Sequence, residues 1–257
     1  MHKNGKNIVL LCSDGDSTKA VYQALRSEFG KIIVIMEDDI PKSLLVKRRI
    51  KKLGLFPVFG QLLFMSAVVP VLRFSGKNRI KELKETLKIR DIEDEIIRID
   101  SVNSESGRAA LQSADPELVV VNGTRIISKE TLQCVNAKFV NMHAGITPLY
   151  RGVHGGYWAL LEKNANLVGT TIHFVDTGID TGNIIEQAFF EVSPADNFAT
   201  YPYLHTKAGI DILVKNIKLI LDGNLEGNNR QMNLPSKLRY HPTIWQYIYH
   251  YIKQKVR

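Results

Sequence analysis

The chain has 257 residues, 44% of them hydrophobic, which is enough for one large domain or for a domain with a small extension. Its two cysteines, Cys12 and Cys134, belong to no Cys-x-x-Cys or His/Cys cluster. This excludes a disulfide framework and a recognisable metal site, and it favours the cytoplasm. The formal net charge of +8 favours anionic partners without choosing among nucleotides, phosphates, lipid and RNA.

Strand and helix patterns alternate in the amino-terminal half of the chain. Apolar runs of strand length occur at 7–12, 31–36, 95–99, 117–122 and 137–142. Helical periodicity occupies 18–29, 77–89, 104–113 and 127–135. The alternation implies crossover connections, and it predicts an α/β fold with a Rossmann-like, mostly parallel sheet and helices on both faces.

The carboxyl-terminal half changes pattern. The segments 168–175 and 183–192 flank the loop VDTGIDTG, and their alternation predicts antiparallel strands. Residues 198–222 have the periodicity of one helix. A domain therefore extends over 1–222, and a short helical extension follows at 223–257.

The tail of this extension carries isoleucines at a regular spacing. Ile244, Ile248 and Ile252 recur every four residues within 236–257. This spacing predicts one amphipathic helix that packs on the domain or on a partner.

The segment 47–73 departs from the pattern. Its five basic residues precede a stretch without charge, 53–72, that reaches transmembrane length. Pro57 and Pro70, with two glycines, predict helix breaks. Three interpretations stay open: a buried helical hairpin or homodimer interface, a peripheral contact with the inner face of a membrane, and a true span. The basic residues are Lys47, Arg48, Arg49, Lys51 and Lys52.

Polar residues cluster where the predicted strands end. In a sheet of this kind, ligands bind outside the carboxyl ends of the strands. Asn141 and His143 lie two residues apart, so they share one face of their strand. An amide N–H can donate to an oxyanion and an imidazole can move a proton, as acyl transfer to an amine requires. Asp176 and Asp180 are the candidates that would keep the imidazole cationic.

Two motifs give the chain a resemblance to a known family. NMHAGITPLYRG, at 141–152, is followed by GTTIHFVDTGIDTGNIIEQ, at 169–187. In this order they resemble the folate-dependent formyltransferases, which include sugar N-formyltransferases, glycinamide ribonucleotide formyltransferase and the catalytic domain of methionyl-tRNA formyltransferase. The resemblance covers about 7–222, and it implies a formyltransferase catalytic domain with 10-formyltetrahydrofolate as co-substrate and no metal.

The resemblance also implies roles for individual residues. The catalytic Asn, His and Asp of the family match Asn141, His143 and Asp180. The second histidine of the motif matches His173, for which packing and catalysis are both open. The family's His-Pro-Ser-x-Leu-Pro is replaced here by HAGITP, at 143–148. Binding of the folate is implied, largely through backbone groups, for Arg125, Ile126, Ile127, Val175, Asp176 and Gly178.

Other residues are candidates for binding the acceptor. The loop 13–18 precedes a predicted helix, whose amino terminus could bind a phosphate or be a plain cap. Arg151 could meet an acceptor phosphate or brace its loop, and Lys207 suits a sugar diphosphate. The loop residues in question are Ser13, Gly15, Ser17 and Thr18.

The expected acceptor is a nucleotide-linked amino sugar of surface-polysaccharide synthesis. The alternative, glycinamide ribonucleotide, is disfavoured because the family's His-x-x-Glu-His run aligns with His205–Gly209, which places Ala208 where a ribose-binding Glu would stand. Formyltetrahydrofolate hydrolase and a non-catalytic folate-binding or membrane-adaptor protein are further alternatives. No nucleic-acid partner is expected, since 223–257 is too short for the barrel of the tRNA-specific enzymes.

Overall fold

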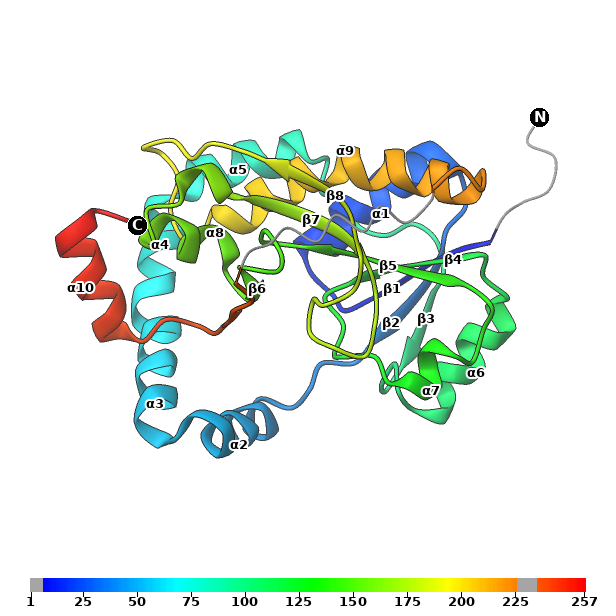
Figure 1. The fold of residues 1–257 in the computed structure, drawn as a ribbon, viewed down its shortest axis with the longest axis horizontal. Coiled ribbons are helices and arrows are strands. Elements are labelled where there is room, and N and C mark those ends of the chain that lie inside the picture. The colour runs from blue at the N-terminus through cyan, green and yellow to red at the C-terminus, as the bar shows by residue number, and fades with distance from the viewer. Residues whose placement is uncertain (1–6, 226–234) are drawn as a thin grey trace.

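A computed structural model describes residues 7–225 and 235–257 (Figure 1). The predicted extension and the start of the predicted domain therefore each include residues, 226–234 and 1–6, that lie outside the described part. A seven-stranded sheet, ordered β3-β2-β1-β4-β5-β7-β8, forms the centre of the molecule. The first five strands of the chain are parallel, as buried apolar runs joined by crossovers predict. They are β1 (Ile8–Cys12), β2 (Ile33–Glu37), β3 (Ile96–Ile99), β4 (Leu118–Asn122) and β5 (Lys138–His143).

Two antiparallel strands extend the sheet beyond β5. Strand β7 (Gly169–Phe174) pairs antiparallel with β5, and β8 (Ile184–Phe189) pairs antiparallel with β7. The predicted fold class is therefore confirmed. The loop between β7 and β8 reaches back over the carboxyl end of β5, which is where catalytic groups were expected.

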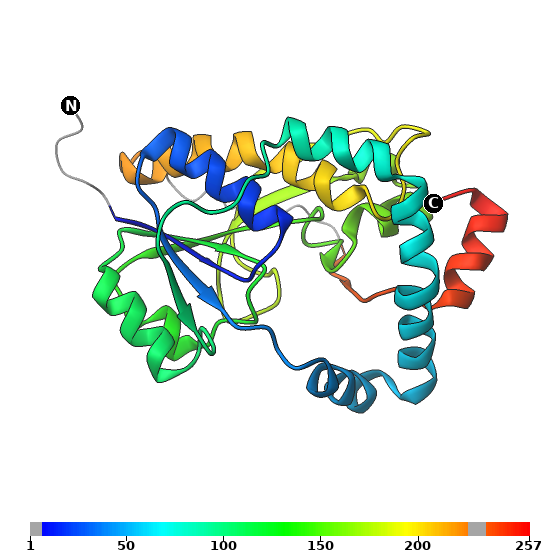
Figure 2. The same ribbon diagram turned by 180° about the vertical axis from the view of Figure 1, so that it is seen from behind.

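Helices cover both faces of the sheet (Figures 1 and 2). Alternate strand residues point to opposite faces, so Leu10 packs in the core under α1 (Asp16–Phe29) and α9 (Tyr201–Leu221), with α5 (Lys77–Thr86) beside α9. Val9 instead packs in the core under α6 (Glu105–Ala114). The short helix α7 (Lys129–Leu132) lies on the same side as α6.

The segment 47–73 forms helices that extend away from the sheet (Figure 2). Helix α2 (Lys42–Leu53) is followed by a helical stretch made of α3 (Leu55–Leu63), the π-helical turn η1 (Phe64–Val68) and α4 (Val69–Ser75). By length and composition, Leu55–Ser75 could cross a membrane.

Of the predicted helix breaks in this segment, the one at Gly54 is confirmed, because α2 ends there and Gly54 has a φ of 87°. The helical stretch Leu55–Ser75 nevertheless continues through Pro57, Gly60 and Pro70. Pro57 lies in the first turn of α3, where its missing N–H would have no intrahelical partner. Pro70 lies in the first turn of α4, directly after the π-helical turn, which adjusts the hydrogen bonding there. The buried hairpin is wrong, because Leu55 and Phe74 are 70% and 73% exposed.

The tail contributes a strand as well as a helix. Strand β9 (Leu238–Arg239) pairs with β6 (Arg151–Gly152), the turn that ends the first motif. Helix α8 (Gly155–Leu161) and the 3-10 turn η2 (Ala165–Leu167) follow β6. The tail therefore joins the catalytic half of the molecule instead of forming one helix over 236–257.

Helix α10 (Ile244–Gln254) packs against α3, but not through the predicted face. Tyr247 is buried, whereas Ile248 and Ile252 are exposed. The Trp245 ring stacks on Phe56 with ring centroids 4.4 Å apart, and it lies so close to Gly60 that a Cβ there would come within 2.2 Å of it. The aromatic residues therefore form most of the packed face, and of the three predicted isoleucines Ile244 packs against the same core cluster.

Candidate active site

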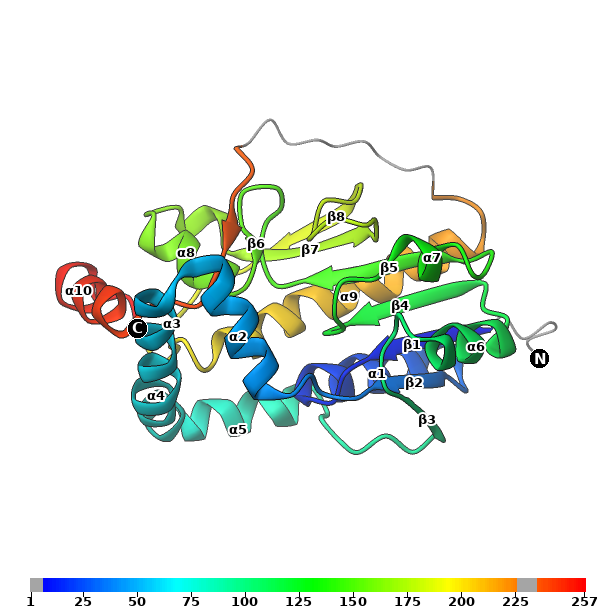
Figure 3. The ribbon, with the colours of Figure 1, turned by 90° about the horizontal axis from the view of Figure 1, so that it is seen from below.

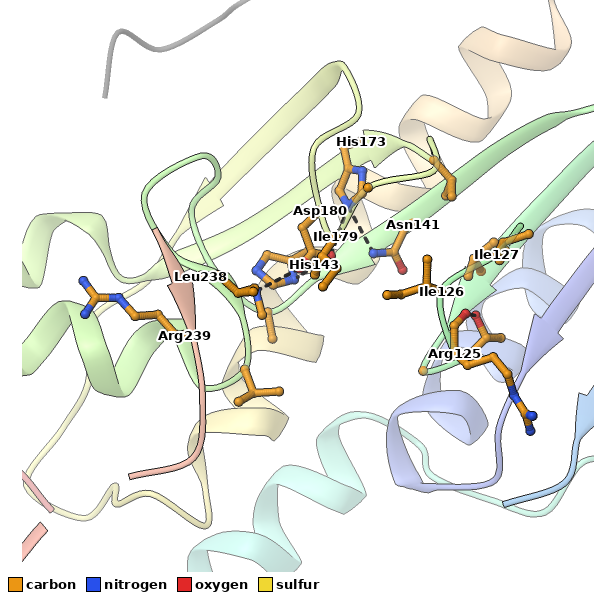
Figure 4. Close-up of a pocket in the computed structure, with 18 of the residues that line it drawn as sticks. Arg125, Ile126, Ile127, Asn141, His143, His173, Ile179, Asp180, Leu238 and Arg239 are labelled. Carbon is orange, nitrogen blue, oxygen red and sulfur yellow. Dashed lines mark hydrogen bonds and ion pairs between the residues drawn. The ribbon is translucent and has the colours of Figure 1, made fainter. Parts of the chain in front are cut away.

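The two predicted catalytic residues of β5 lie at its carboxyl end and face one cavity (Figure 4). Asn141 and His143 are alternate residues of the strand, so their side chains leave it on the same side. The antiparallel register with β7 places His173 directly opposite Asn141. The loop after β7 then brings Asp180 to the same place.

His143 is buried between two hydrogen-bond acceptors. Its Nδ1 lies 3.3 Å from Oδ1 of Asp180, and its Nε2 lies 2.7 Å from the carbonyl oxygen of Tyr150. Burial alone would lower the pKa of His143, but the hydrogen bond and charge of Asp180, with the Tyr150 carbonyl, outweigh it and raise the pKa above the ordinary value. With both ring nitrogens donating, the arrangement stabilises the imidazolium.

Asp180 is held in place by the residues around it. Its Oδ2 accepts the backbone N–H of Gly152 at 2.9 Å, and its backbone has a φ of 51°, which is uncommon outside glycine. Burial would raise the pKa of this carboxyl, but the hydrogen bond and charge of His143, with the backbone N–H of Gly152, hold it well below its usual range. Asp180 is therefore an anion that neutralises the imidazolium.

Asn141 donates one amide hydrogen to His173. Its Nδ2 lies 3.1 Å from Nε2 of His173, whose Nδ1 lies 2.7 Å from the carbonyl oxygen of Phe174. The His173 ring therefore carries a proton on Nδ1 and accepts the amide at Nε2, which fixes the orientation of Asn141. The second amide hydrogen remains for a substrate oxygen. An amide donor beside an imidazolium can stabilise an oxyanion that develops in acyl transfer.

The cavity around these residues has a volume of about 500 Å³. Its walls come from distant parts of the chain: the loop after β4, the end of β5, the loop after β7, the tail, and helices α2 and α3. The lining includes six residues predicted to bind folate: Arg125, Ile126, Ile127, Val175, Asp176 and Gly178.

The loop after β4 suits a flat heterocycle through its backbone. Among the described residues, the N–H groups of Ile126 and Ile127 donate to no partner, and the side chain of Ile126 is exposed to the cavity. Val121 and Val175 add apolar surface nearby. Open donors beside apolar walls can bind the polar edge and the face of a flat ring system.

Arg125 differs from its neighbours, since its polar groups are engaged elsewhere. Its backbone N–H donates to Oε1 of the buried Glu37 at 2.6 Å, and its Nε lies 2.6 Å from Oε2 of the same carboxylate. The guanidinium also donates to the carbonyls of Asp38 and Asp100, and it points away from the catalytic residues (Figure 4). Through these contacts Arg125 holds the loop after β4 in place.

The predicted phosphate loop, 13–18, does not line this cavity. Thr18 is buried and donates to the carbonyl of Ser13, while Asn122 donates to the hydroxyls of Ser17 and Thr18. These bonds tie the loop to β4. The backbone of Gly15 caps α1 without a side-chain hydrogen bond.

The two predicted cations are also directed elsewhere. Arg151 donates to the carbonyl of Ile179 at 3.0 Å, which braces the loop that carries Asp180. Lys207 is exposed on α9, away from the cavity lining. Neither side chain reaches the cavity.

Residues that the sequence did not single out for substrate binding form another part of the cavity wall. Arg49 of α2 and Gln61 of α3 line the cavity, together with Tyr240 and His241 of the tail. Arg49 lies 3.1 Å from His241 Nε2, and Gln61 donates to the His241 carbonyl at 3.0 Å. No sequence signal indicates these contacts, because they join segments about 180 residues apart.

The described part of the chain holds no cluster of three or more His, Cys, Asp or Glu residues that could bind a metal ion.

The sequence is similar to those of known formyltransferases. A curated relative, methionyl-tRNA formyltransferase of Clostridium tetani, is 30% identical over 208 residues, which cover 79% of this chain and 56% of that protein. The first curated relatives that the chain matches are covered over 37% to 56% of their own length.

Two solved structures share the fold at 19% sequence identity. Glycinamide ribonucleotide transformylase 1 of Symbiobacterium toebii has a TM-score of 0.57, with 89% of this chain and 93% of that chain covered. An N-formyltransferase of Helicobacter canadensis, in complex with folinic acid and dTDP-3-aminofucose, has a TM-score of 0.53, with 90% and 70% covered.

A family model described as formyl transferase matches residues 68–217. The match includes Asn141, His143 and Asp180, and it spans more than half of the 257 residues. The chain belongs to the formyl transferase family.

Proposed function

We propose that this protein transfers a formyl group from 10-formyltetrahydrofolate to the primary amine of a nucleotide-linked amino sugar, as a step in surface-polysaccharide synthesis. The observation that carries the proposal is the contact between His143 and Asp180, 3.3 Å apart, beside Asn141 in one cavity. The folate supplies the activated formyl group.

The catalytic residues would act on the charge that develops during the attack. Asn141 and His143 would donate to the formyl oxygen as the amine adds to the formyl carbon. Nε2 of His143 now donates to the carbonyl of Tyr150, so a substrate oxygen would share or replace that acceptor. Asp180 would keep His143 cationic and relay a proton, directly or through water, from the attacking amine to the folate nitrogen. Collapse of the tetrahedral intermediate would then break the bond between that nitrogen and the formyl carbon and release tetrahydrofolate.

The folate would lie along the loop after β4 and the loop after β7. The open N–H groups of Ile126 and Ile127 would bind polar edges of the pterin, and Val121 and Val175 would cover its face. Asp176 accepts hydrogen bonds from the N–H of Gly178 and from Thr181, so it shapes the loop that forms one side of this site.

The acceptor would lie against the wall formed by α2, α3 and the tail. Arg49 makes no ion pair with an acidic residue in the described part of the chain, so its guanidinium can bind an acceptor phosphate. Oε1 of Gln61 is buried without a hydrogen-bond partner among the described residues, and it can accept from a sugar hydroxyl or a base. We therefore propose that Arg49 binds the acceptor phosphate, since Lys207 is exposed on α9 and does not line the cavity.

A panel of acceptors tests this proposal. Thymidine- and uridine-diphosphate 4-amino and 3-amino sugars, together with glycinamide ribonucleotide, would each be incubated with 10-formyltetrahydrofolate, and kcat/KM would be measured for each. We expect an amino sugar nucleotide to be the best substrate. Efficient turnover of glycinamide ribonucleotide with none of the sugars formylated would overturn the acceptor assignment and indicate a role in purine synthesis.

A further inference from the structure

The helical stretch Leu55–Ser75 exposes apolar side chains along one of its faces. The exposed residues recur every three or four positions along α3 and less regularly beyond η1, while the opposite face packs on the domain. Leu55 and Phe74, near its two ends, are 70% and 73% exposed. The other exposed large apolar residues of the stretch are Phe56, Phe59, Leu62, Met65 and Val71.

Helix α10 enlarges this apolar surface. It lies beside α3 in both ribbon views (Figures 1 and 2). The rings of Phe56, on α3, and Trp245, on α10, stack on each other. The solvent side of α10 adds Ile248, Tyr249, Tyr251 and Ile252, all of them exposed. We call the surface formed by α2, α3, α4 and α10 the helical edge (Figure 3).

The charge of the whole chain is concentrated in the segments that form this edge. Residues 42–75, which form α2, α3 and α4, contain seven Lys or Arg and no Asp or Glu, and 244–257, with α10, contain three and none. The rest of the chain holds 24 Lys or Arg against all 26 acidic residues, so without these segments the net charge would be negative. On α2, the exposed cations Lys47, Arg48 and Lys51 form no ion pair with any described residue.

We propose that the helical edge binds the surface of an anionic lipid bilayer. Apolar side chains beside unpaired cations are what a bilayer interface with anionic headgroups attracts. A second copy of the chain fits less well. It would bring like charges together, because neither segment of the edge contains a carboxylate to pair with the cations.

The connectivity of the sheet excludes a transmembrane arrangement of Leu55–Ser75 in this fold. Strand β2 precedes the helical stretch and β3 follows it, yet the two strands pair with each other, Val34 opposite Ile96. A single span would place its two ends on opposite sides of the membrane. The helix therefore lies along the bilayer surface, with Gln61 and Phe64 buried on its protein side.

Vesicle co-sedimentation of the intact chain tests this binding. The vesicles would be phosphatidylcholine alone, or phosphatidylcholine with phosphatidylglycerol, at low and at high NaCl. We expect binding to the anionic vesicles, weakened by salt, and little binding to the neutral ones. Equal binding to both vesicle types, or none to anionic vesicles at low salt, would overturn the proposal.

Two variants of the edge separate its contributions. The triple variant Lys47→Gln, Arg48→Gln, Lys51→Gln should lose about a hundredfold in vesicle affinity, from about a factor of five for each cation. The variant Phe59→Ser, Val71→Ser should lose about tenfold or more. These side chains are exposed, so both variants should keep the thermal unfolding temperature of the parent.

A matched control variant also removes three positive charges, but from positions away from the helical edge. Lys31 precedes β2 and Lys138 begins β5, so both lie at the amino ends of strands, whereas α2 follows the carboxyl end of β2. Replacing these two and Lys129 by Gln should leave vesicle binding unchanged. An equal loss in the control would mean that net charge, and not the edge, causes binding.

A measurement of self-association tests whether a second copy of the chain, and not a bilayer, covers the helical edge. If the chain formed a dimer that Phe59→Ser, Val71→Ser dissociates, and bound no anionic vesicles, the edge would be a subunit interface and the proposal would be wrong. The binding assay uses no folate or amine acceptor, so its outcome is independent of the proposed enzymatic function.

Discussion

Replacing Asp180 by Asn removes the charge that holds His143 in its cationic form. The perturbation is nearly isosteric, and the new side-chain oxygen can still accept the N–H of Gly152, which now donates at 2.9 Å. The backbone φ of 51° is also one that Asn tolerates. The substitution should therefore change the electrostatics of the site more than its shape.

The size of the effect follows from the geometry. Two unit charges 3.3 Å apart attract by about 5 kcal/mol at an effective dielectric constant of about 20. Loss of even 1.4 kcal/mol of this attraction changes the ratio of imidazolium to imidazole about tenfold. Burial, which lowers the pKa of His143, then acts without its main counterweight. At neutral pH the variant should hold His143 mostly uncharged.

The assay is kcat as a function of pH. The proposed active form is the imidazolium, and the pKa of His143 is raised, so the parent should lose this form, and with it kcat, as pH rises through that pKa. Asp180→Asn should lower kcat at neutral pH by about 10²–10³, the usual effect of losing an oxyanion donor, with partial recovery as pH falls. Asp176→Asn is the control and should be milder. A profile for Asp180→Asn that matches the parent in height and shape would refute the reasoning.

Three further changes test other parts of the structure. Gly60→Ala places a Cβ 2.2 Å from the ring of Trp245, so it should lower the free energy of unfolding by about 1–3 kcal/mol in thermal melts; an unchanged melt would contradict the packing of α10 on α3. Arg49→Ala should raise KM for a phosphorylated acceptor by about ten- to hundredfold in steady-state assays, with a smaller change in kcat. Lys207→Ala should leave KM unchanged. A raised KM in Lys207→Ala but not in Arg49→Ala would show that the phosphate binds at α9 instead. Asn141→Ala should lower kcat about 10²–10³ without changing the melt, and near-normal turnover would remove Asn141 from the oxyanion site.

The sheet could be predicted because each strand is a short apolar run with a turn at each end. Residues buried on both faces leave a continuous apolar signal, so the parallel strands were evident in sequence. The common orientation of Asn141 and His143 could be predicted from the strand itself, because residues two apart in an extended chain point to the same face. Asp180 was found through a motif and not through periodicity, because its loop has no regular pattern.

The cavity wall that we propose for the acceptor could not be predicted, because it is made by contacts between distant segments. Nothing local to Arg49 or Gln61 indicates that the tail returns to them and that His241 lies between. The hydrogen bond from the backbone of Arg125 to Glu37 is likewise non-local, and it holds the loop after β4 in place. Such residues become visible only when the chain is folded.

Two local rules gave wrong predictions in the helical regions. Proline breaks a helix interior, but Pro57 and Pro70 lie in first turns, and no sequence rule located the π-helical turn between them. On α10, spacing alone selected the isoleucines, while the larger buried area of Tyr247 and the stacking of Trp245 determined the packed face.

The stoichiometry of formyl transfer tests the central claim most directly. The protein would be mixed with 10-formyltetrahydrofolate carrying a labelled formyl group and with an amino sugar nucleotide, and tetrahydrofolate release would be followed together with the mass of the sugar product. We predict one labelled formyl group on the amine for each tetrahydrofolate released, and loss of both products in Asn141→Ala. Release of tetrahydrofolate with labelled formate and no formylated amine from any acceptor in the panel would contradict the account and show a hydrolase.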